Sequence, residues 1–175
     1  MNPMQKTDLS AVLADLFSEL VNGPPRGGSA FMLNSGDAGL LRSLAKLSVA
    51  DASQSVNGGA TIAAHARHLQ YGLSLMNRWA REGGDPFADA TWDAAWRTTQ
   101  VDAQEWASIL DGLKEEIGRW QQALGSPPEA SREELAGMIG SIAHLAYHLG
   151  AIRQIARGAR GPKEGTFVLR DRYAL

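Results

Sequence analysis

Four long stretches of this chain carry apolar side chains at every third or fourth position, and helix-breaking segments rich in glycine and proline separate them. Apolar residues at this spacing lie on one face of an α-helix, and that face must be buried against other helices. The stretches are residues 7–22, 60–81, about 102–125 and 131–157. No segment alternates apolar and polar residues for long enough to indicate a strand. The sequence therefore predicts an all-α fold.

The lengths of the connections indicate how these four helices are joined. About six residues link the third helix to the fourth, and so short a link favours antiparallel neighbours. About twenty residues link the second helix to the third, which is enough chain to run back along a helix of about 33 Å. We therefore expect a four-helix bundle with long crossover connections and short helices in the loops. One short helix should follow the turn at residues 34–37 and run through Leu47.

Two pairs of residues mark expected helix starts. Asp102 with Glu105, and Ser131 with Glu134, have the spacing of a capping box, in which two residues satisfy backbone N–H groups reciprocally. The last helix should end near Gly158, because glycine is favoured just after a helix.

Length and composition exclude several classes of protein. A chain of 175 residues has the usual size of one domain, so we predict a single domain over 1–175, with its core at about 7–158 and a C-terminal extension at 159–175. Apolar residues make up 44% of the chain and charged residues 21%, which is ordinary for a globular protein. The net charge of −2 predicts no general attraction to nucleic acid or to a membrane surface. The chain has no cysteine, which excludes disulfides, thiolate metal ligands and a cysteine nucleophile. Because we find no signal peptide and no run as long as a membrane span, we expect a cytoplasmic protein.

The chain has four histidines, and all of them lie in two of the predicted helices. His144 and His148 are four positions apart, so both should project from one side of the last helix, and His148 should point towards the interior. His65 and His68 are three positions apart in the second helix. Helical bundles build metal sites from side chains on facing helices, so all four are candidate ligands. The alternative is that they are buried histidines hydrogen-bonded to backbone carbonyl groups.

The segments around these histidines resemble a known family. Residues 142–154, with the sequence IAHLAYHLGAIRQ, resemble the last-helix motif of the DinB/YfiT-like superfamily, and residues 62–69, IAAHARHL, resemble its second-helix motif. The likeness extends from about residue 8 to 158. It implies a four-helix bundle with up-down-down-up connections. It also implies a divalent metal held by three histidines, one from the second helix and two from the fourth.

On this resemblance the ligands are His68, His144 and His148. The family's second-helix ligand is usually followed by leucine, as His68 is by Leu69. His65 lies about 60° away around the same helix, so it remains an alternative ligand or a partner that orients one.

The donor set narrows the choice of metal and of chemistry. Three neutral imidazoles suit zinc, nickel, iron or copper better than magnesium or calcium, and zinc is our first choice. Three protein ligands would leave a position open for water or substrate, as in catalytic sites. The resemblance implies a small-molecule substrate, either a hydrolase reaction or a transferase reaction that uses a low-molecular-weight thiol, and a homodimer. The alternatives are a metal-binding, stress-related bundle without catalytic activity and a metal-free interaction bundle.

The sequence does not identify a general base. Asp37, Asp85 and Asp89 in the loops are candidates, and so is Tyr147 between the two histidines of the last helix. Tyr147 lies about 100° from each histidine around the helix, which favours packing over catalysis. A capping role in a turn explains Asp37 more simply than a place in a cleft.

Two further groups of residues each allow a functional and a structural interpretation. Trp92 and Trp96 could form the roof of a pocket, but tryptophans in a helical domain are more often core or interface residues. Arg153, Arg157 and Arg160 could bind a phosphate or carboxylate group. Positive side chains near the end of a helix also complement its dipole, and we favour that explanation.

Overall fold

The computed structural model describes residues 6–125 and 130–162, and in these residues it contains seven α-helices, a short 3-10 helix and no strand. The predicted all-α class is therefore confirmed. The residues 163–175 of the expected C-terminal extension lie outside the described part of the chain. The helices are α1 (Lys6–Asn22), α2 (Gly39–Leu44), α3 (Val49–Ala52), α4 (Ile62–Glu82), α5 (Asp93–Trp96), α6 (Ala103–Gly125), α7 (Arg132–Ile155) and the 3-10 helix η1 (Arg157–Ala159).

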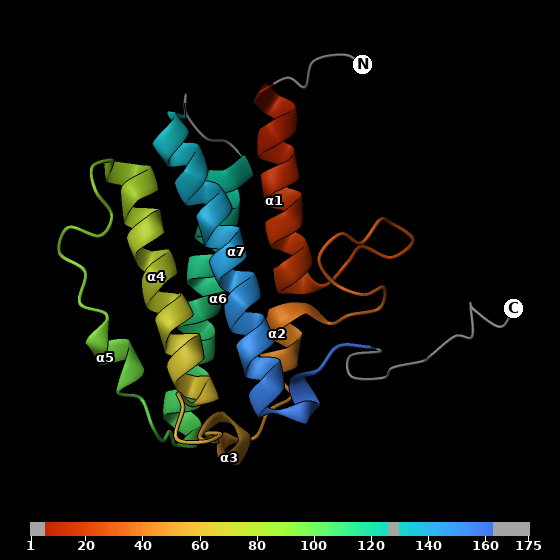
Figure 1. Cartoon of the computed structure of the whole chain (residues 1–175), viewed down its shortest axis with the longest axis vertical. Helices are drawn as coiled ribbons and strands as arrows, with labels where there is room; N and C mark the ends of the chain where they lie inside the picture. Colours follow the sequence, from red (N-terminus) through yellow and green to blue (C-terminus); the bar gives the residue numbers. More distant parts are fainter. Residues whose placement is uncertain (1–5, 126–129, 163–175) are drawn as a thin grey trace, which may run out of the picture.

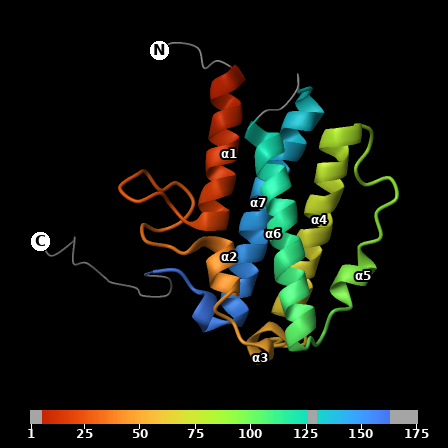
Figure 2. The same cartoon turned by 180° about the vertical axis from the view of Figure 1, so that it is seen from behind.

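The four long helices α1, α4, α6 and α7 lie side by side (Figure 1). In Figure 1, α1 and α7 run downwards, whereas α4 and α6 run upwards. Helix α7 lies between α1 and α4 on one side of the molecule, and Figure 2 shows α6 between them on the other. Accordingly, α6 and α7 each contact both α1 and α4. The long connection at 83–102 carries α5 and joins the two parallel helices α4 and α6.

The capping pairs read from the sequence begin the helices as expected. Ser131 and Glu134 form a capping box at the start of α7. At the start of α6, the carboxylate of Asp102 accepts from the Glu105 N–H at 2.8 Å, and the carboxylate of Glu105 accepts from the Asp102 N–H at 3.1 Å. The prediction that α7 ends near Gly158 was wrong. The helix ends at Ile155, because the next residue has an extended backbone with φ −116° and ψ 117°.

The prediction of a single short helix that runs through Leu47 was also wrong. The segment forms α2, which ends at Leu44, and then α3, which begins at Val49. Ser48 and Asp51 form a capping box that starts α3, with the Ser48 side chain accepting from the Asp51 N–H at 3.1 Å. This pair has the spacing that marks a helix start, so the sequence contained the signal.

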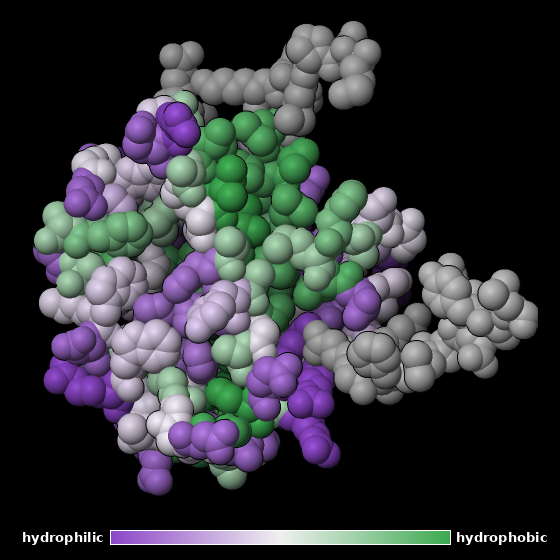
Figure 3. Space-filling model, in the orientation of Figure 1, coloured by the Kyte–Doolittle hydropathy of each residue, from purple (hydrophilic) through white to green (hydrophobic). Residues whose placement is uncertain are grey.

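Helix α7 combines a buried apolar row with an apolar outer face. Met138, Ile142, Leu145, Leu149 and Ile152 are at most 6% exposed and form part of the core. Contrary to the expectation from sequence, α7 is long and apolar enough to cross a membrane by length and composition alone. A core helix of a globular protein passes the same test, so this finding carries little weight. Figure 3 shows apolar side chains gathered over the upper parts of α7 and α1.

A buried carboxylate anchors the connection that follows α1. Glu19 is 4% exposed, and its side chain accepts hydrogen bonds from the backbone N–H groups of Phe31, Met32 and Leu33 at 2.7–3.1 Å. A carboxylate can accept several such bonds at once, and bonds to a charged acceptor are stronger than neutral ones. Glu19 therefore holds the glycine- and proline-rich connection against α1.

Replacing Glu19 with glutamine is expected to lower the free energy of unfolding by about 1–3 kcal/mol. The amide of glutamine has one acceptor oxygen, and its NH₂ group would face backbone donors. Urea denaturation of the variant and the native protein measures the difference. The matched control is Asp15→Asn, because Asp15 is an exposed acid on the same helix, and we expect its effect to be within about 0.5 kcal/mol. Equal stability of the Glu19 variant and the control would contradict the anchoring role.

Candidate metal centre

The four histidines come from two neighbouring helices. Helix α4 carries His65 and His68, α7 carries His144 and His148, and the two helices are in contact. His148 is 1% exposed, His68 is 6% and His65 is 8%, whereas His144 is exposed. The expectation that His148 points into the molecule is confirmed.

Three imidazole nitrogens converge between the helices. The Nε2 atom of His144 lies 3.0 Å from Nε2 of His68 and 3.1 Å from Nε2 of His148. One ligand atom from each of the three residues can be chosen so that all lie within 4.8 Å of one another. Two nitrogens that bind one zinc ion at about 2.0–2.1 Å in tetrahedral geometry are about 3.4 Å apart. The three rings therefore need only a small adjustment to hold a metal ion.

His65 lies behind this group and contacts it through one ring. Its Nδ1 atom is 2.8 Å from Nδ1 of His148, so one of these two atoms carries the shared proton. If His148 uses Nε2 as a ligand, its Nδ1 carries the proton and donates it to His65. Such a hydrogen bond to the far side of a ligand ring fixes its tautomer and its orientation.

Hydrogen bonds alone satisfy this group poorly. The three Nε2 atoms face one another. If Nε2 of His144 carries a proton, it can donate to its neighbours only when the Nε2 atoms of His68 and His148 are unprotonated and act as acceptors. His68 then carries its proton on Nδ1, which is buried and has no hydrogen-bond partner within the described part of the chain. A metal ion would accept all three Nε2 lone pairs at once. The residues therefore fit a divalent metal by their donor chemistry.

The environment keeps these imidazoles neutral. Burial lowers the pKa of His148 to about 3, helped by the neighbouring His144, His65 and His68. Burial likewise lowers the pKa of His68 to about 4, with smaller effects from His144 and His65. Burial also lowers the pKa of His65 and of His144. A neutral imidazole is the form that binds a metal, so at neutral pH no proton has to be displaced first.

The metal-free protein is expected to lose stability as the pH falls from about 6.5 to about 4. In this range an unfolded histidine binds a proton, whereas the buried His68 and His148 with their lowered pKa values do not. The unfolded state therefore binds more protons, and acid favours it. Urea midpoints measured in EDTA across this range test the prediction. In the variant His68→Gln, the side chain at position 68 does not titrate, so the urea midpoint should depend less on pH than in the native protein. Equal slopes of the midpoint against pH in the two proteins would contradict the prediction.

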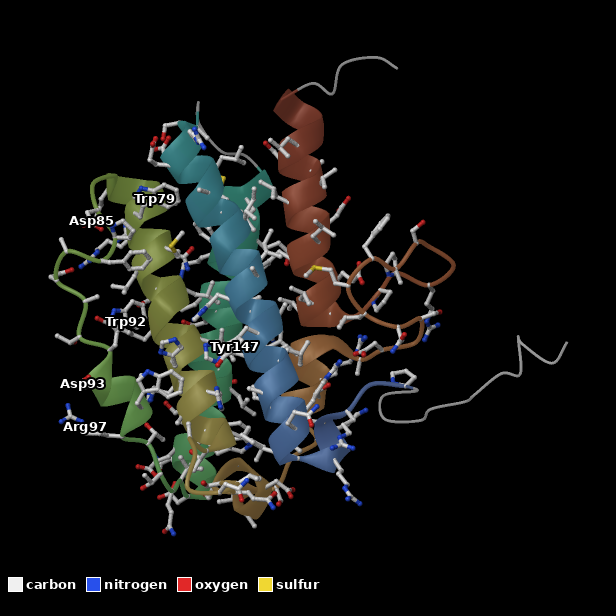
Figure 4. The ribbon with its side chains drawn as sticks, viewed as in Figure 1. Trp79, Asp85, Trp92, Asp93, Arg97 and Tyr147 are labelled. Carbon is white, nitrogen blue, oxygen red and sulfur yellow. The ribbon has the colours of Figure 1, made fainter. Side chains whose placement is uncertain are left out.

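Two tryptophans cover the histidine rings. The Trp96 ring stacks on His68, with ring centroids 4.3 Å apart, and meets the edge of His65 at 5.5 Å. Trp92 lies 5.2 Å from the His68 ring. Figure 4 shows Trp92 directed from the connection towards α4, whereas Arg97 points away from the helices. Trp92 lines the cavity beside the site, which confirms its interpretation as part of a pocket roof. Trp96 stacks on His68 but is not among the described residues that line this cavity, and because it is 37% exposed its interpretation as a core residue was wrong.

The acidic candidates for a general base have other partners. Asp37 accepts from Arg153 at 2.7 Å and from the Gly39 N–H at 2.8 Å. Asp85 accepts from the Phe87 N–H at 2.9 Å and so caps its own turn. The capping role expected for Asp37 is thus confirmed. Its pairing with an arginine 116 positions away is a contact that no local pattern predicts.

The remaining candidates also have positions of their own. Asp89 pairs with Arg78 at the surface. Tyr147 is 69% exposed, so the expectation that it is packed was wrong, although its ring meets the edge of His148 at 5.1 Å. Arg153 pairs with Asp37 instead of complementing only the helix dipole, and Arg160 donates to the Arg153 carbonyl at 3.1 Å.

The structure therefore brings together His68, His144 and His148, with His65 against His148 on the side away from them. It places none of the acidic candidates among the hydrogen-bond partners of the four rings. Residues that the sequence did not assign firmly, the tryptophans of the α4–α6 connection, complete the surroundings. In comparisons with known proteins, the chain matches no family model, no curated protein and no solved structure.

Proposed function

We propose that this protein is a metal-dependent enzyme of the DinB/YfiT kind, an up-down-down-up four-helix bundle that acts on a small molecule. In this proposal His68, His144 and His148 hold one divalent metal ion, with zinc as first choice and nickel or iron as alternatives. The observation that carries it is the convergence of three Nε2 atoms from two helices, in which Nε2 of His144 lies 3.0 Å from that of His68 and 3.1 Å from that of His148.

The donor set supports a reactive site over a closed structural one. Structural zinc sites are usually closed by four protein ligands, whereas catalytic sites keep three and leave one position open. When bound, the metal supplies Lewis-acid chemistry, which activates either water for hydrolysis or the thiol of a low-molecular-weight cosubstrate. We therefore propose hydrolysis or thiol-dependent transfer as the reaction.

The chain's own residues divide the remaining tasks between them. The exposed position of His144 leaves one side of the site open to a substrate. Trp92 and Trp96 lie against the ring of His68 and shield it from water. His65 is a positioning residue, because it reaches the site only through Nδ1 of His148. Mutation of such a partner typically lowers metal affinity about 10- to 100-fold.

The assembly and the location remain predictions. A homodimer would have a suitable surface in the apolar face over the upper parts of α1 and α7 (Figure 3). Exposed large apolar residues occur on both helices, with Val12 of α1 43% exposed and Ile139 of α7 50% exposed. We retain the cytoplasm as the expected compartment, and we expect neither nucleic acid nor membrane as a partner.

The test is a screen of the zinc-loaded protein against hydrolysable esters and amides, each with and without a low-molecular-weight thiol. We expect turnover that rises with bound zinc and is lost in His144→Ala. Because His144 is exposed, this change should leave the fold intact. The matched control is Gln154→Ala, an exposed position on the same helix, which should retain activity. Stoichiometric zinc without turnover on any substrate would favour a metal-binding bundle without catalytic activity.

A further inference from the structure

A cavity of about 780 Å³ adjoins the candidate metal centre. It lies between α4, α7 and the connection that follows α4, and His144 forms part of its wall. This volume is within the usual range of about 300–1,000 Å³ for pockets that bind small molecules. The cavity therefore offers space for a ligand that extends well beyond the metal itself.

The cavity is elongated along the two helices. On α7 its wall includes Glu133, Gly137, Gly140 and His144, which are three or four positions apart and so share one face of the helix. With a rise of 1.5 Å per residue, the wall from Glu133 to His144 is about 16 Å long. Figure 4 shows Trp79 near one end of α4 and Trp92 farther from that end, and both residues line the cavity. The ring of Trp92 lies 5.2 Å from that of His68.

The walls are mostly apolar, and among the described residues they include no lysine or arginine. Met76, Trp79, Phe87 and Trp92 provide large apolar surfaces, and Glu133 and Glu134 are the acidic residues that line the cavity within residues 6–125 and 130–162. The two glutamates lie in the first turn of α7, whereas His144 lies farther along the same helix. This arrangement favours an uncharged apolar ligand body and disfavours a carboxylate or phosphate along the cavity.

Two glycines leave part of the α7 wall without side chains. A Cβ atom added at Gly140 would have no neighbour within 4 Å, and one added at Gly137 would meet only Met76 and Trp79 at ordinary contact distances of 3.8 and 3.9 Å. Neither glycine is therefore required by a close approach of another chain segment. Both lie in the interior of α7, where glycine costs about 1 kcal/mol relative to alanine.

From this geometry we infer that the cavity binds an elongated, uncharged and largely apolar small molecule whose single metal-binding group reaches the three histidines past His144. The inference rests on the proposed function, because it identifies the cavity's ligand as the substrate of that site. It adds the chemical class of the substrate, which the histidines alone do not specify.

Straight-chain alkyl hydroxamic acids, from acetohydroxamic to octanohydroxamic acid, provide the test on the zinc-loaded full chain. Each carries one metal-binding group and an uncharged tail of increasing length. Isothermal titration calorimetry should show a dissociation constant that falls about three- to fourfold for each methylene buried in the cavity. A dissociation constant that does not change with chain length, while zinc remains bound, would overturn the inference and leave the metal site standing.

Two glycine variants localise the effect. Gly140→Leu places a side chain in the cavity and should remove most of the gain with chain length. Gly150→Leu is the matched control, because Gly150 is on the same helix, also has no neighbour within 4 Å of an added Cβ atom, and does not line the cavity. If Gly140→Leu fails to fold by circular dichroism, Gly137→Leu fills the same wall. A loss of chain-length dependence in both Gly140→Leu and Gly150→Leu would contradict the location.

A second probe separates the cavity from the metal. Nile red is uncharged and apolar, and its fluorescence reports binding to the EDTA-treated protein. We expect saturable binding that is at least about tenfold weaker in Gly140→Leu than in Gly150→Leu. If the protein holds no zinc, the proposed function fails, and this measurement alone decides the cavity. Equal dye binding by the two variants would then refute the apolar binding site.

Discussion

Replacing His144 with alanine should lower the affinity for zinc by at least about a hundredfold, whereas replacing His65 with glutamine should lower it only about 10- to 100-fold. His144 provides the Nε2 atom that lies close to both other candidate ligands. His65 is hydrogen-bonded to Nδ1 of His148, the atom on the far side of that ring from its ligand atom, so the loss of His65 leaves all three ligand atoms in place. Competition with a chelator of known zinc affinity measures both constants.

The order of the two effects distinguishes His68 from His65 as the ligand on α4. His68→Ala should weaken zinc binding as strongly as His144→Ala does. Gln154→Ala, at an exposed position on α7, should bind zinc as the native protein does. A greater loss of affinity in the His65 variant than in the His68 variant would reverse the assignment.

Replacing Asp37 with alanine is expected to lower the free energy of unfolding by about 3–5 kcal/mol. Asp37 pairs with Arg153 at 2.7 Å, and their side chains are only 1% and 4% exposed. Removing the carboxylate takes one charged acceptor away from the buried guanidinium group of Arg153, and the Gly39 N–H loses its acceptor. Folded domains have a net stability of about 5–15 kcal/mol, so this loss should be visible in urea denaturation.

An exposed ion pair provides the comparison. Asp89 and Arg78 form an ion pair with side chains 67% and 36% exposed. Such pairs typically contribute about 0–1 kcal/mol, because water and salt screen the charges. Asp89→Ala should therefore have a small effect in the same assay. If the Asp37 and Asp89 variants lose the same small amount of stability, the buried pair has no special structural role.

Most of the helical architecture could be predicted because it depends on local signals. The apolar spacing in residues 60–81 and the capping pairs at Asp102 and Ser131 locate helices α4, α6 and α7 to within a few residues. The end of α7 was harder to predict. Glycine at 158 suggested a stop there, but the backbone leaves the helix at Ala156, which no local motif marks.

The histidine site was predictable in part for the same reason. Spacing along a helix places His144 and His148 on one side, and it needs no knowledge of the rest of the fold. The choice between His68 and His65 depends on how α4 is rotated against α7. Spacing within one helix does not contain that information, and only a motif resemblance favoured His68. In the structure, His68 faces His144, and His65 faces the far side of His148.

Long-range polar contacts could not be predicted. The pair of Asp37 and Arg153 joins residues 116 positions apart, and Glu19 binds backbone groups of a connection whose path the sequence does not fix. One hint was available: Glu19 lies between the apolar residues Leu16 and Leu20 on a helix, where a free carboxylate would be costly. The position of Trp96 over the histidines likewise depends on the course of the α4–α6 connection.

The metal content of the full chain purified without chelator or affinity tag tests the central claim most directly. Elemental analysis should find about one divalent metal ion per native chain, as a single three-histidine site requires. It should find almost none in the double variant His144→Ala/His148→Ala. Circular dichroism must show that this variant remains helical. A native protein without metal that also takes up no zinc, nickel or iron on dialysis would contradict the account.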